Sequence, residues 1–192
     1  MSDLILRTNN LSKNYYLGTY DHLKFFKILN QLISNKKDEN YKIIALNNIN
    51  ISIEKGESVA ILGKNGYGKT TLCKLISEVT EPSSGFIELY GKVVPILALT
   101  FGVQFETTGS ENIKFLGSMF GVNKNYVEEN MAKITEFGNI SQFIETPLKK
   151  YSSGMITRLI FSTLINFPSD LYLLDEVLAV SDQSFKNRAI KK

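Results

Sequence analysis

Eight consecutive residues combine glycines with a lysine and a threonine at a spacing that suits phosphate binding. They are Gly63-Lys64-Asn65-Gly66-Tyr67-Gly68-Lys69-Thr70, and they follow an apolar run at residues 58–62. Glycines let the backbone bend so that successive N–H groups point at an anion, and a following helix directs the positive end of its dipole there. The pattern G-x-x-x-x-G-K-[ST] between a strand and a helix therefore predicts a nucleotide phosphate site.

Each polar side chain of this loop has an expected task. Lys69 supplies a positive charge for the β- and γ-phosphates, Thr70 supplies a hydroxyl ligand for Mg²⁺, and Thr71 assists by packing or hydrogen bonding. The alternative is a glycine-rich turn that matches by chance, which is expected on the order of one per cent of the time in a chain of this length. The residues expected to contact the nucleotide through this loop are Gly63, Asn65, Gly66, Gly68, Lys69, Thr70 and Thr71.

An acidic pair, Asp175-Glu176, follows the apolar run Leu171–Leu174. A short apolar run of this kind is typical of a buried parallel strand, and nucleotide chemistry occurs at the carboxyl ends of such strands. We expect Asp175 to hold Mg²⁺ through water and Glu176 to act as the general base that polarises the attacking water. An ordinary solvated Asp-Glu pair is the alternative interpretation.

The elements that must position these residues are expected to alternate between strands and helices. Residues 43–53 and 58–62 flank the turn Glu54-Lys55-Gly56 and are predicted to be neighbours in one sheet. Strands are predicted at residues 4–11, 43–53, 58–62, 86–89, 93–99 and Leu171–Leu174. Helices are predicted at residues 69–79, 110–120, 123–137 and 155–167, and an amphipathic helical segment at 25–33.

Composition narrows the class of protein. The chain has 192 residues and a net formal charge of +3, which is too small and too scattered to indicate a nucleic-acid partner. It contains no apolar run long enough to span a membrane and no signal-peptide pattern at its start, so a cytosolic location is expected. The single cysteine, Cys73, is expected to be a core residue, and the single histidine, His22, excludes a histidine-cluster metal site.

The segment Tyr151-Ser152-Ser153-Gly154-Met155 resembles the signature motif of ABC ATPases, just before a predicted helix. In that family the motif completes the ATP site of the opposite subunit in a head-to-tail dimer, and a Ser–Gly backbone at a helix N-terminus suits a γ-phosphate. The resemblance assigns this role to Ser152 and Gly154. The motif departs from the usual L-S-G-G-Q at Tyr151, Ser153 and Met155.

These departures resemble one branch of the family, the ATP-binding subunits that export O-antigen, capsular polysaccharide or teichoic acid. The same branch is indicated by residues 108–112, by residues 175–182 and by an insertion at 16–42. The resemblance implies that Tyr15 stacks on adenine, that Gln104 senses Mg²⁺ and the membrane partner, and that Asp182 lies in an intersubunit loop. The alternatives are a packing role for Tyr15, a surface role for Gln104 and a helix cap at Asp182.

The implied fold is α/β, a P-loop NTPase three-layer core with an inserted ABC-type helical subdomain. Within one domain spanning 1–192, the predicted parts are the insertion at 16–42, a nucleotide-binding core at 43–107, a helical subdomain at 108–167 and an acidic strand with intersubunit loop at 168–192. The amphipathic segment 25–33 could contact the membrane partner or pack on its own domain.

The resemblance implies an ATPase that uses ATP and Mg²⁺ to drive export of a polysaccharide or lipid-linked glycan. The implied partners are a transmembrane permease and a second identical subunit, with no nucleic acid, at the cytoplasmic face of the bacterial cell membrane. The glycan itself is not identified, because substrate choice lies largely in other subunits or domains.

ABC ATPases of this kind carry a further strand that ends in a switch histidine, whereas this sequence ends at Lys192 and has only His22. We therefore expect the C-terminal strands of the fold to be missing. The alternatives to a working exporter subunit are a truncated or degenerate subunit that binds nucleotide without turnover, and a non-transport ABC ATPase.

Overall fold

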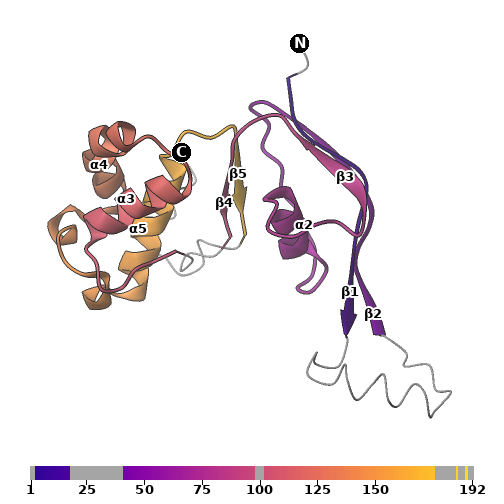
Figure 1. Ribbon diagram of the computed structural model, residues 1–192, viewed down its shortest axis with the longest axis horizontal. Helices are drawn as coiled ribbons and strands as arrows, with labels where there is room; N and C mark the ends of the chain where they lie inside the picture. The colour runs from indigo at the N-terminus through magenta and orange to yellow at the C-terminus, as the bar shows by residue number, and fades with distance from the viewer. Residues whose placement is uncertain (1–2, 18–40, 98–101, 176–184, 186–188, 190–192) are drawn as a thin grey trace, which may run out of the picture. The chain divides into compact units, whose positions relative to one another are not determined.

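The computed structural model describes residues 3–17, 41–97 and 102–175 together with Phe185 and Ala189 (Figure 1). The chain divides into two compact units, Met1–Leu89 and Tyr90–Lys192. The predicted amphipathic segment 25–33 and nearly all of the predicted insertion 16–42 lie outside the described residues. The predicted subregions 43–107, 108–167 and 168–192 stay predictions.

In its described residues, the first unit is an antiparallel three-stranded sheet with one helix beside it. Strands β1 (Leu4–Leu17), β2 (Tyr41–Glu54) and β3 (Ser84–Leu89) are ordered β2-β1-β3, and the helix is α2 (Lys69–Ile76). Figure 1 shows α2 on one side of this curved sheet. Its core contains side chains from both elements: Ile5, Leu6, Leu11, Leu46, Leu72, Leu75 and Ile76.

Strand β1 runs six residues further than the predicted end at residue 11, because residues 13–17 continue to pair with β2. The β1–β2 register shifts around Asn10 and Asn48, which have φ of 47° and 52°. Asparagine tolerates this left-handed conformation better than most residues. The Thr8 hydroxyl accepts from the Ile51 N–H at 2.9 Å and the Ser12 hydroxyl from the Asn48 N–H at 2.9 Å. The strands therefore bend without leaving these backbone donors unpaired.

The second unit joins a two-stranded parallel sheet to a group of helices (Figure 1). Strand β4 (Val93–Ile96) pairs with β5 (Leu171–Leu174), and the helices with described bounds are α3 (Gly109–Met119), α4 (Lys124–Gly138) and α5 (Ser153–Ile165). Two single 3₁₀ turns, η2 (Ser141–Phe143) and η3 (Leu148–Lys150), connect α4 to α5. The buried residues that hold these elements together include Ile96, Ile113, Leu116, Val127, Ile134, Ile160, Phe161, Leu164, Phe167 and Phe185.

Side-chain caps begin the helices α3, α4 and α5. The Thr108 side chain accepts from the Glu111 N–H at the start of α3, Asn123 caps α4, and Ser152 caps α5. Each cap satisfies a backbone donor that the first turn of a helix leaves without a partner. The predicted helices 110–120, 123–137 and 155–167 are thus confirmed, with ends shifted by two residues or fewer.

Two predictions about the first unit need correction. Residues 58–62 form no strand, and β2 pairs with β1 rather than with this segment. An apolar run marks a segment suited to a buried strand, but a strand forms only where neighbouring backbones supply hydrogen bonds. Helix α2 ends at Ile76 instead of 79, because the Ser77 hydroxyl donates to the Cys73 carbonyl and Glu78 has a positive φ of 57°. As predicted, Cys73 is buried.

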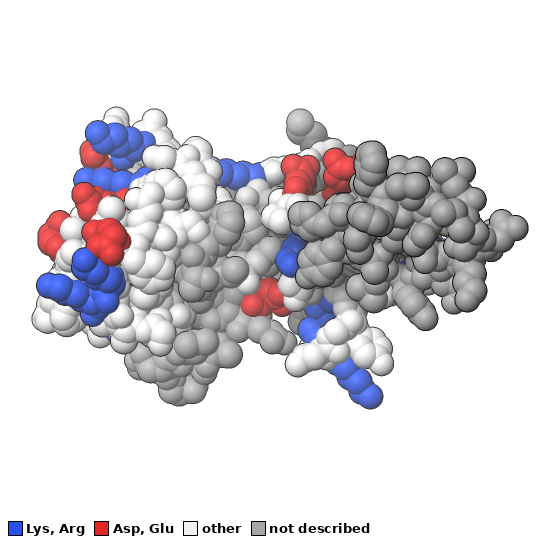
Figure 2. All heavy atoms as spheres, turned by 60° about the horizontal axis from the view of Figure 1, so that its bottom comes forward, with Lys and Arg blue, Asp and Glu red and all other residues white. Residues whose placement is uncertain are grey.

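Charges are mixed on the helical part of the second unit. Figure 2 shows basic and acidic side chains interspersed there, consistent with ion pairs such as Lys124–Glu128 at 3.8 Å. Among the described residues, no helix is long and apolar enough to cross a membrane.

Candidate functional site

The glycine-rich loop packs against strand β2 at Gly68. Gly66 and Gly68 have φ of 83° and 84°, in the left-handed region that glycine enters without steric cost. A Cβ on Gly68 would also collide with the Ala45 carbonyl oxygen and lie 2.9 Å from Leu46 Cδ2. Gly68 is therefore required both by its backbone angle and by the close approach of the loop to β2.

Lys69, the first residue of α2, turns its ammonium group back onto the loop. Its Nζ donates to the Gly63 carbonyl at 2.8 Å and to the Lys64 carbonyl at 3.0 Å. The N-cap residue Gly68 makes no side-chain cap, and the first turn of α2 has no acidic residue. A helix start with a lysine and without a carboxylate favours an anion. The motif predicts a strand, a loop and a helix, and the loop and the helix are confirmed. The Lys69 ammonium and the backbone N–H groups at the start of α2 are donors of the kind that bind phosphates.

The other predicted residues of this loop lie where the motif requires them. Thr70 and Thr71 are the second and third residues of α2. Asn65 is exposed in the turn that precedes the helix. The contacts of these three residues with a nucleotide stay predictions.

Tyr15 lies on the face of the sheet that carries the loop. Lys13 pairs with Leu46, the residue that Gly68 approaches, so the side chains of Lys13 and Leu46 share a face. Tyr15 shares that face too, because the Lys13 ammonium lies over its ring. The Tyr15 side chain is 40% exposed. The first unit thus brings Tyr15 to the same side of β1 and β2 as the phosphate loop.

In the second unit, Gln104 is held by its backbone while its side chain is exposed. The Gln104 N–H donates to Asn112 Oδ1 at 2.9 Å, and Asn112 Nδ2 donates to the Gln104 carbonyl at 3.0 Å. Asn112 is buried on α3 and also donates to the Thr108 carbonyl at 2.8 Å. One buried amide therefore fixes the loop that presents Gln104.

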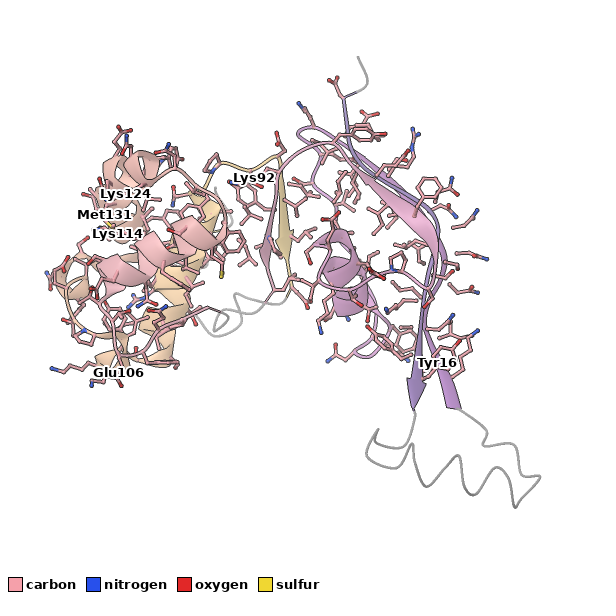
Figure 3. The ribbon with its side chains drawn as sticks, viewed as in Figure 1. Tyr16, Lys92, Glu106, Lys114, Lys124 and Met131 are labelled. Atoms are coloured by element: carbon pink, nitrogen blue, oxygen red, sulfur yellow. The ribbon has the colours of Figure 1, made fainter. Side chains whose placement is uncertain are left out.

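The Gln104 loop is paired with the segment that leads into the signature motif. The Leu148 N–H donates to the Thr107 carbonyl at 3.0 Å, and the Lys149 N–H to the Phe105 carbonyl at 2.9 Å. Lys149 forms an ion pair at 2.6 Å with Glu106, which is labelled in Figure 3. That pair is exposed and contributes little by itself, so the backbone bonds are the main connection between the two segments.

The signature motif begins helix α5. Ser152 is the N-cap residue, and its hydroxyl accepts from the Met155 N–H at 3.2 Å. Gly154 lies in the first turn, and a Cβ added there would meet only Ser152 Oγ, at 3.9 Å. The helix has 13 residues and no acidic residue in its first turn. This is a helix N-terminus suited to an anion, as the motif predicts.

Asp175 follows strand β5 at the carboxyl edge of the parallel pair. Its N–H donates to the Ile96 carbonyl at 3.4 Å, so it lies beside the end of β4. The chain that leads to Gln104 leaves this edge, because β4 and β5 are parallel and in register. Glu176 and Asp182 lie outside the described residues.

Asn112 and Tyr151 are positioning residues to which sequence reasoning assigned no role. Each makes its contacts with backbone groups that local patterns do not identify: Asn112 with Gln104 and Tyr151 with Phe143. For Asn112 the available signal was a polar side chain on the apolar face of a predicted helix, which in a core needs hydrogen-bond partners.

Comparison with known proteins gives one family and consistent relatives. The family model described as "ABC transporter" matches residues 46–179. The chain is 38% identical to the teichoic acids export ATP-binding protein TagH of Bacillus cereus over 97% of its own length and 33% of that protein. It is 35% identical to the O-antigen export system ATP-binding protein RfbB of Klebsiella pneumoniae over 97% of its length and 76% of that protein. The chain therefore spans about one third of the first relative.

A solved structure supports the fold. An ATP-binding cassette determined as a dimer in a post-hydrolysis state, bound to ADP and Pi, matches with a TM-score of 0.73 and 18% identity. The match covers 97% of this chain and 80% of that one. The predicted α/β P-loop NTPase class is thereby confirmed.

Proposed function

Because this chain belongs to the ABC transporter family, we propose that it binds and hydrolyses ATP to drive export of a polysaccharide or lipid-linked glycan. The family predicted from the signature motif is confirmed. The polysaccharide assignment is supported by relatives whose names describe teichoic acid and O-antigen export. The observation that carries the proposal is the phosphate loop, with Gly68 packed on β2 and Lys69 turned into the loop.

Binding of the triphosphate is assigned to the loop and the start of α2. The Lys69 ammonium is held by two carbonyl oxygens of the loop, and a phosphate is proposed to take their place. A charge-assisted hydrogen bond to phosphate is stronger than one to a neutral carbonyl. The exposed ring of Tyr15, on the same face, is proposed to stack on the base.

Hydrolysis is assigned to the acidic end of β5. Glu176, the residue after Asp175, is proposed to accept the proton of the attacking water. Mg²⁺, when bound, would neutralise charge on the phosphate oxygens. Thr70, Asp175 and Gln104 are the residues proposed to hold it, and their hydroxyl, carboxylate and amide oxygens are the ligand types that this ion prefers.

The signature motif implies a partner subunit. The α5 N-terminus, capped by Ser152, is proposed to bind the γ-phosphate held by a second copy in a head-to-tail dimer. A transmembrane permease is proposed to receive the motion, and the proposed location of the chain is the cytoplasmic face of the cell membrane. The Gln104 loop is the proposed contact, because it is held to α3 by Asn112 and to the signature segment by backbone bonds.

The first test compares Lys69→Ala with Lys74→Ala by equilibrium binding of ATP. Both changes remove one positive charge from α2, but Lys74 lies in its last turn and is exposed. Loss of Lys69 is expected to weaken ATP binding about tenfold or more, since hydrogen bonds to charged groups contribute about 1.5–3 kcal/mol. Equal affinities for the two variants would contradict the proposed site.

A further inference from the structure

Lys13 places its ammonium group over the ring of Tyr15. Its Nζ lies 5.3 Å from the centroid of the Tyr15 ring. This is within the distance at which an ammonium group is attracted to the face of an aromatic ring, about 6 Å. Tyr15 is otherwise on the open part of β1, just before Tyr16, which Figure 3 shows near the end of the paired strands.

The ammonium group of Lys13 is itself fixed. Nζ donates to Thr80 Oγ1 at 3.0 Å and to the Glu81 carbonyl at 2.6 Å. Both acceptors lie in the segment between α2 and β3. A lysine side chain normally samples many rotamers, and two anchored hydrogen bonds remove most of that freedom. The ammonium is therefore held in one position over the ring of Tyr15.

We propose that Lys13 is a positioning residue for nucleobase recognition, holding the ring of Tyr15 from one face so that the opposite face is presented to the purine. This inference rests on the proposed function, in which Tyr15 stacks on the base. Lys13 acts through Tyr15 and does not touch the nucleotide. It therefore affects the part of the affinity that comes from the base and leaves the part that comes from the phosphates unchanged.

The geometry also gives the competing explanation, in which Lys13 only holds the segment after α2. The Asn14 N–H donates to Ser83 Oγ at 3.0 Å, and the Ser83 N–H donates to the Ser12 carbonyl at 2.8 Å. These bonds tie the same segment to β1 without Lys13. Loss of the ammonium is thus expected to release the Tyr15 ring while the backbone of the segment stays in place.

The test measures binding of ATP and of inorganic tripolyphosphate, both with Mg²⁺, to the full chain and four variants. Lys13→Met removes the ammonium, and Lys55→Met is the matched control, because Lys55 lies at the opposite end of the β1–β2 pair. Tyr15→Leu removes the ring, and the double variant Lys13→Met/Tyr15→Leu measures whether the two residues act together.

Lys13→Met is expected to weaken ATP binding about two- to fivefold, the range that corresponds to a cation–π contact at a partly exposed site. It should leave tripolyphosphate binding unchanged and cause no further loss in the Tyr15→Leu background. Equal weakening of both ligands would show that Lys13 maintains the loop, and no change in ATP binding would show that it does nothing for the ring. Either result overturns the inference.

The same variants separate this inference from the function on which it rests. If Tyr15→Leu binds ATP as tightly as the unchanged chain does, base stacking at Tyr15 is wrong and the role of Lys13 falls with it. Whether the phosphate loop binds ATP would still be decided by Lys69→Ala. If Tyr15→Leu weakens ATP alone while Lys13→Met does not, only the inference about Lys13 fails.

Discussion

Tyr151 stands where the usual signature motif has leucine, and its hydroxyl makes a contact that leucine cannot make. The side chain is buried, and the hydroxyl donates to the Phe143 carbonyl at 2.6 Å. Burial, followed by the charge of Glu145, raises the pKa of Tyr151. A Cβ on Gly109 would lie 2.7 Å from this hydroxyl, so the start of α3 is shaped to fit it. Tyr151 anchors the signature motif to the segment that precedes it.

Tyr151→Phe is expected to destabilise the chain by about 1 kcal/mol, the usual net contribution of one hydrogen bond. Urea unfolding at neutral pH measures the change. Tyr16→Phe is the control, because the Tyr16 side chain is 64% exposed. Because its pKa is raised, Tyr151 contributes fully to the free energy of unfolding below the ordinary tyrosine pKa. That contribution is lost as pH rises through the raised pKa. Equal stabilities of the two variants would contradict the anchoring role.

At the scale of elements, helix α3 is fixed at its start by a reciprocal pair of hydrogen bonds. The Thr108 hydroxyl accepts from the Glu111 N–H at 3.2 Å, and the Thr108 N–H donates to Glu111 Oε2 at 2.8 Å. The backbone N–H of Thr108, and after it the Thr108 hydroxyl, lower the pKa of Glu111. This capping box lies between the Gln104 loop and α3, so it sets where the helix begins.

Glu111→Gln is expected to reduce stability at neutral pH and to have a smaller effect in acid. A carboxyl group with a lowered pKa contributes stability above its ordinary pKa and loses that contribution as pH falls through the lowered value. Unfolding curves between about pH 7 and pH 3 cover the window. Glu129→Gln, exposed on α4, is the control for loss of one carboxylate. If the difference in stability between Glu111→Gln and the unchanged chain is constant across this pH range, the stabilising role of the Glu111 carboxylate is contradicted.

Elements whose signals are local could be predicted from the sequence. The apolar run of β5 and the capped helices α3, α4 and α5 were found within two residues of their ends. The extension of β1 was missed, because it depends on pairing of residues 13–17 with residues 41–46 of β2, which the local pattern does not reveal. Residues 58–62 were predicted as a strand from their apolar run and the preceding turn, neither of which supplies a neighbouring backbone.

At the scale of the whole molecule, the candidate site was predicted only as far as its motifs are contiguous. The loop at Lys69, the signature at Ser152 and the acidic residue Asp175 were each found from a few adjacent residues. Their supports were not found, because Lys13 meets Thr80 from 67 residues away and Asn112 fixes Gln104 across a turn. Such contacts exist only after folding, when distant segments of the chain come together.

The two compact units contribute different candidate residues. The phosphate loop and Tyr15 belong to the first unit, and Gln104, the signature motif and Asp175 belong to the second. The Lys69→Ala variant therefore tests nucleotide binding by the first unit. The Glu176→Gln variant, which changes the residue after Asp175 in the sequence, tests the hydrolysis proposed for the second unit.

The central claim is tested most directly by phosphate release from ATP and Mg²⁺ by the purified chain, measured beside Lys69→Ala and Glu176→Gln. Turnover is predicted for the unchanged chain and for neither variant. Glu176→Gln should still bind ATP, since the change removes the proposed general base and leaves the phosphate loop intact. Binding of ATP without any phosphate release by the unchanged chain would contradict the proposed hydrolysis, and turnover that survives Lys69→Ala would contradict the proposed site.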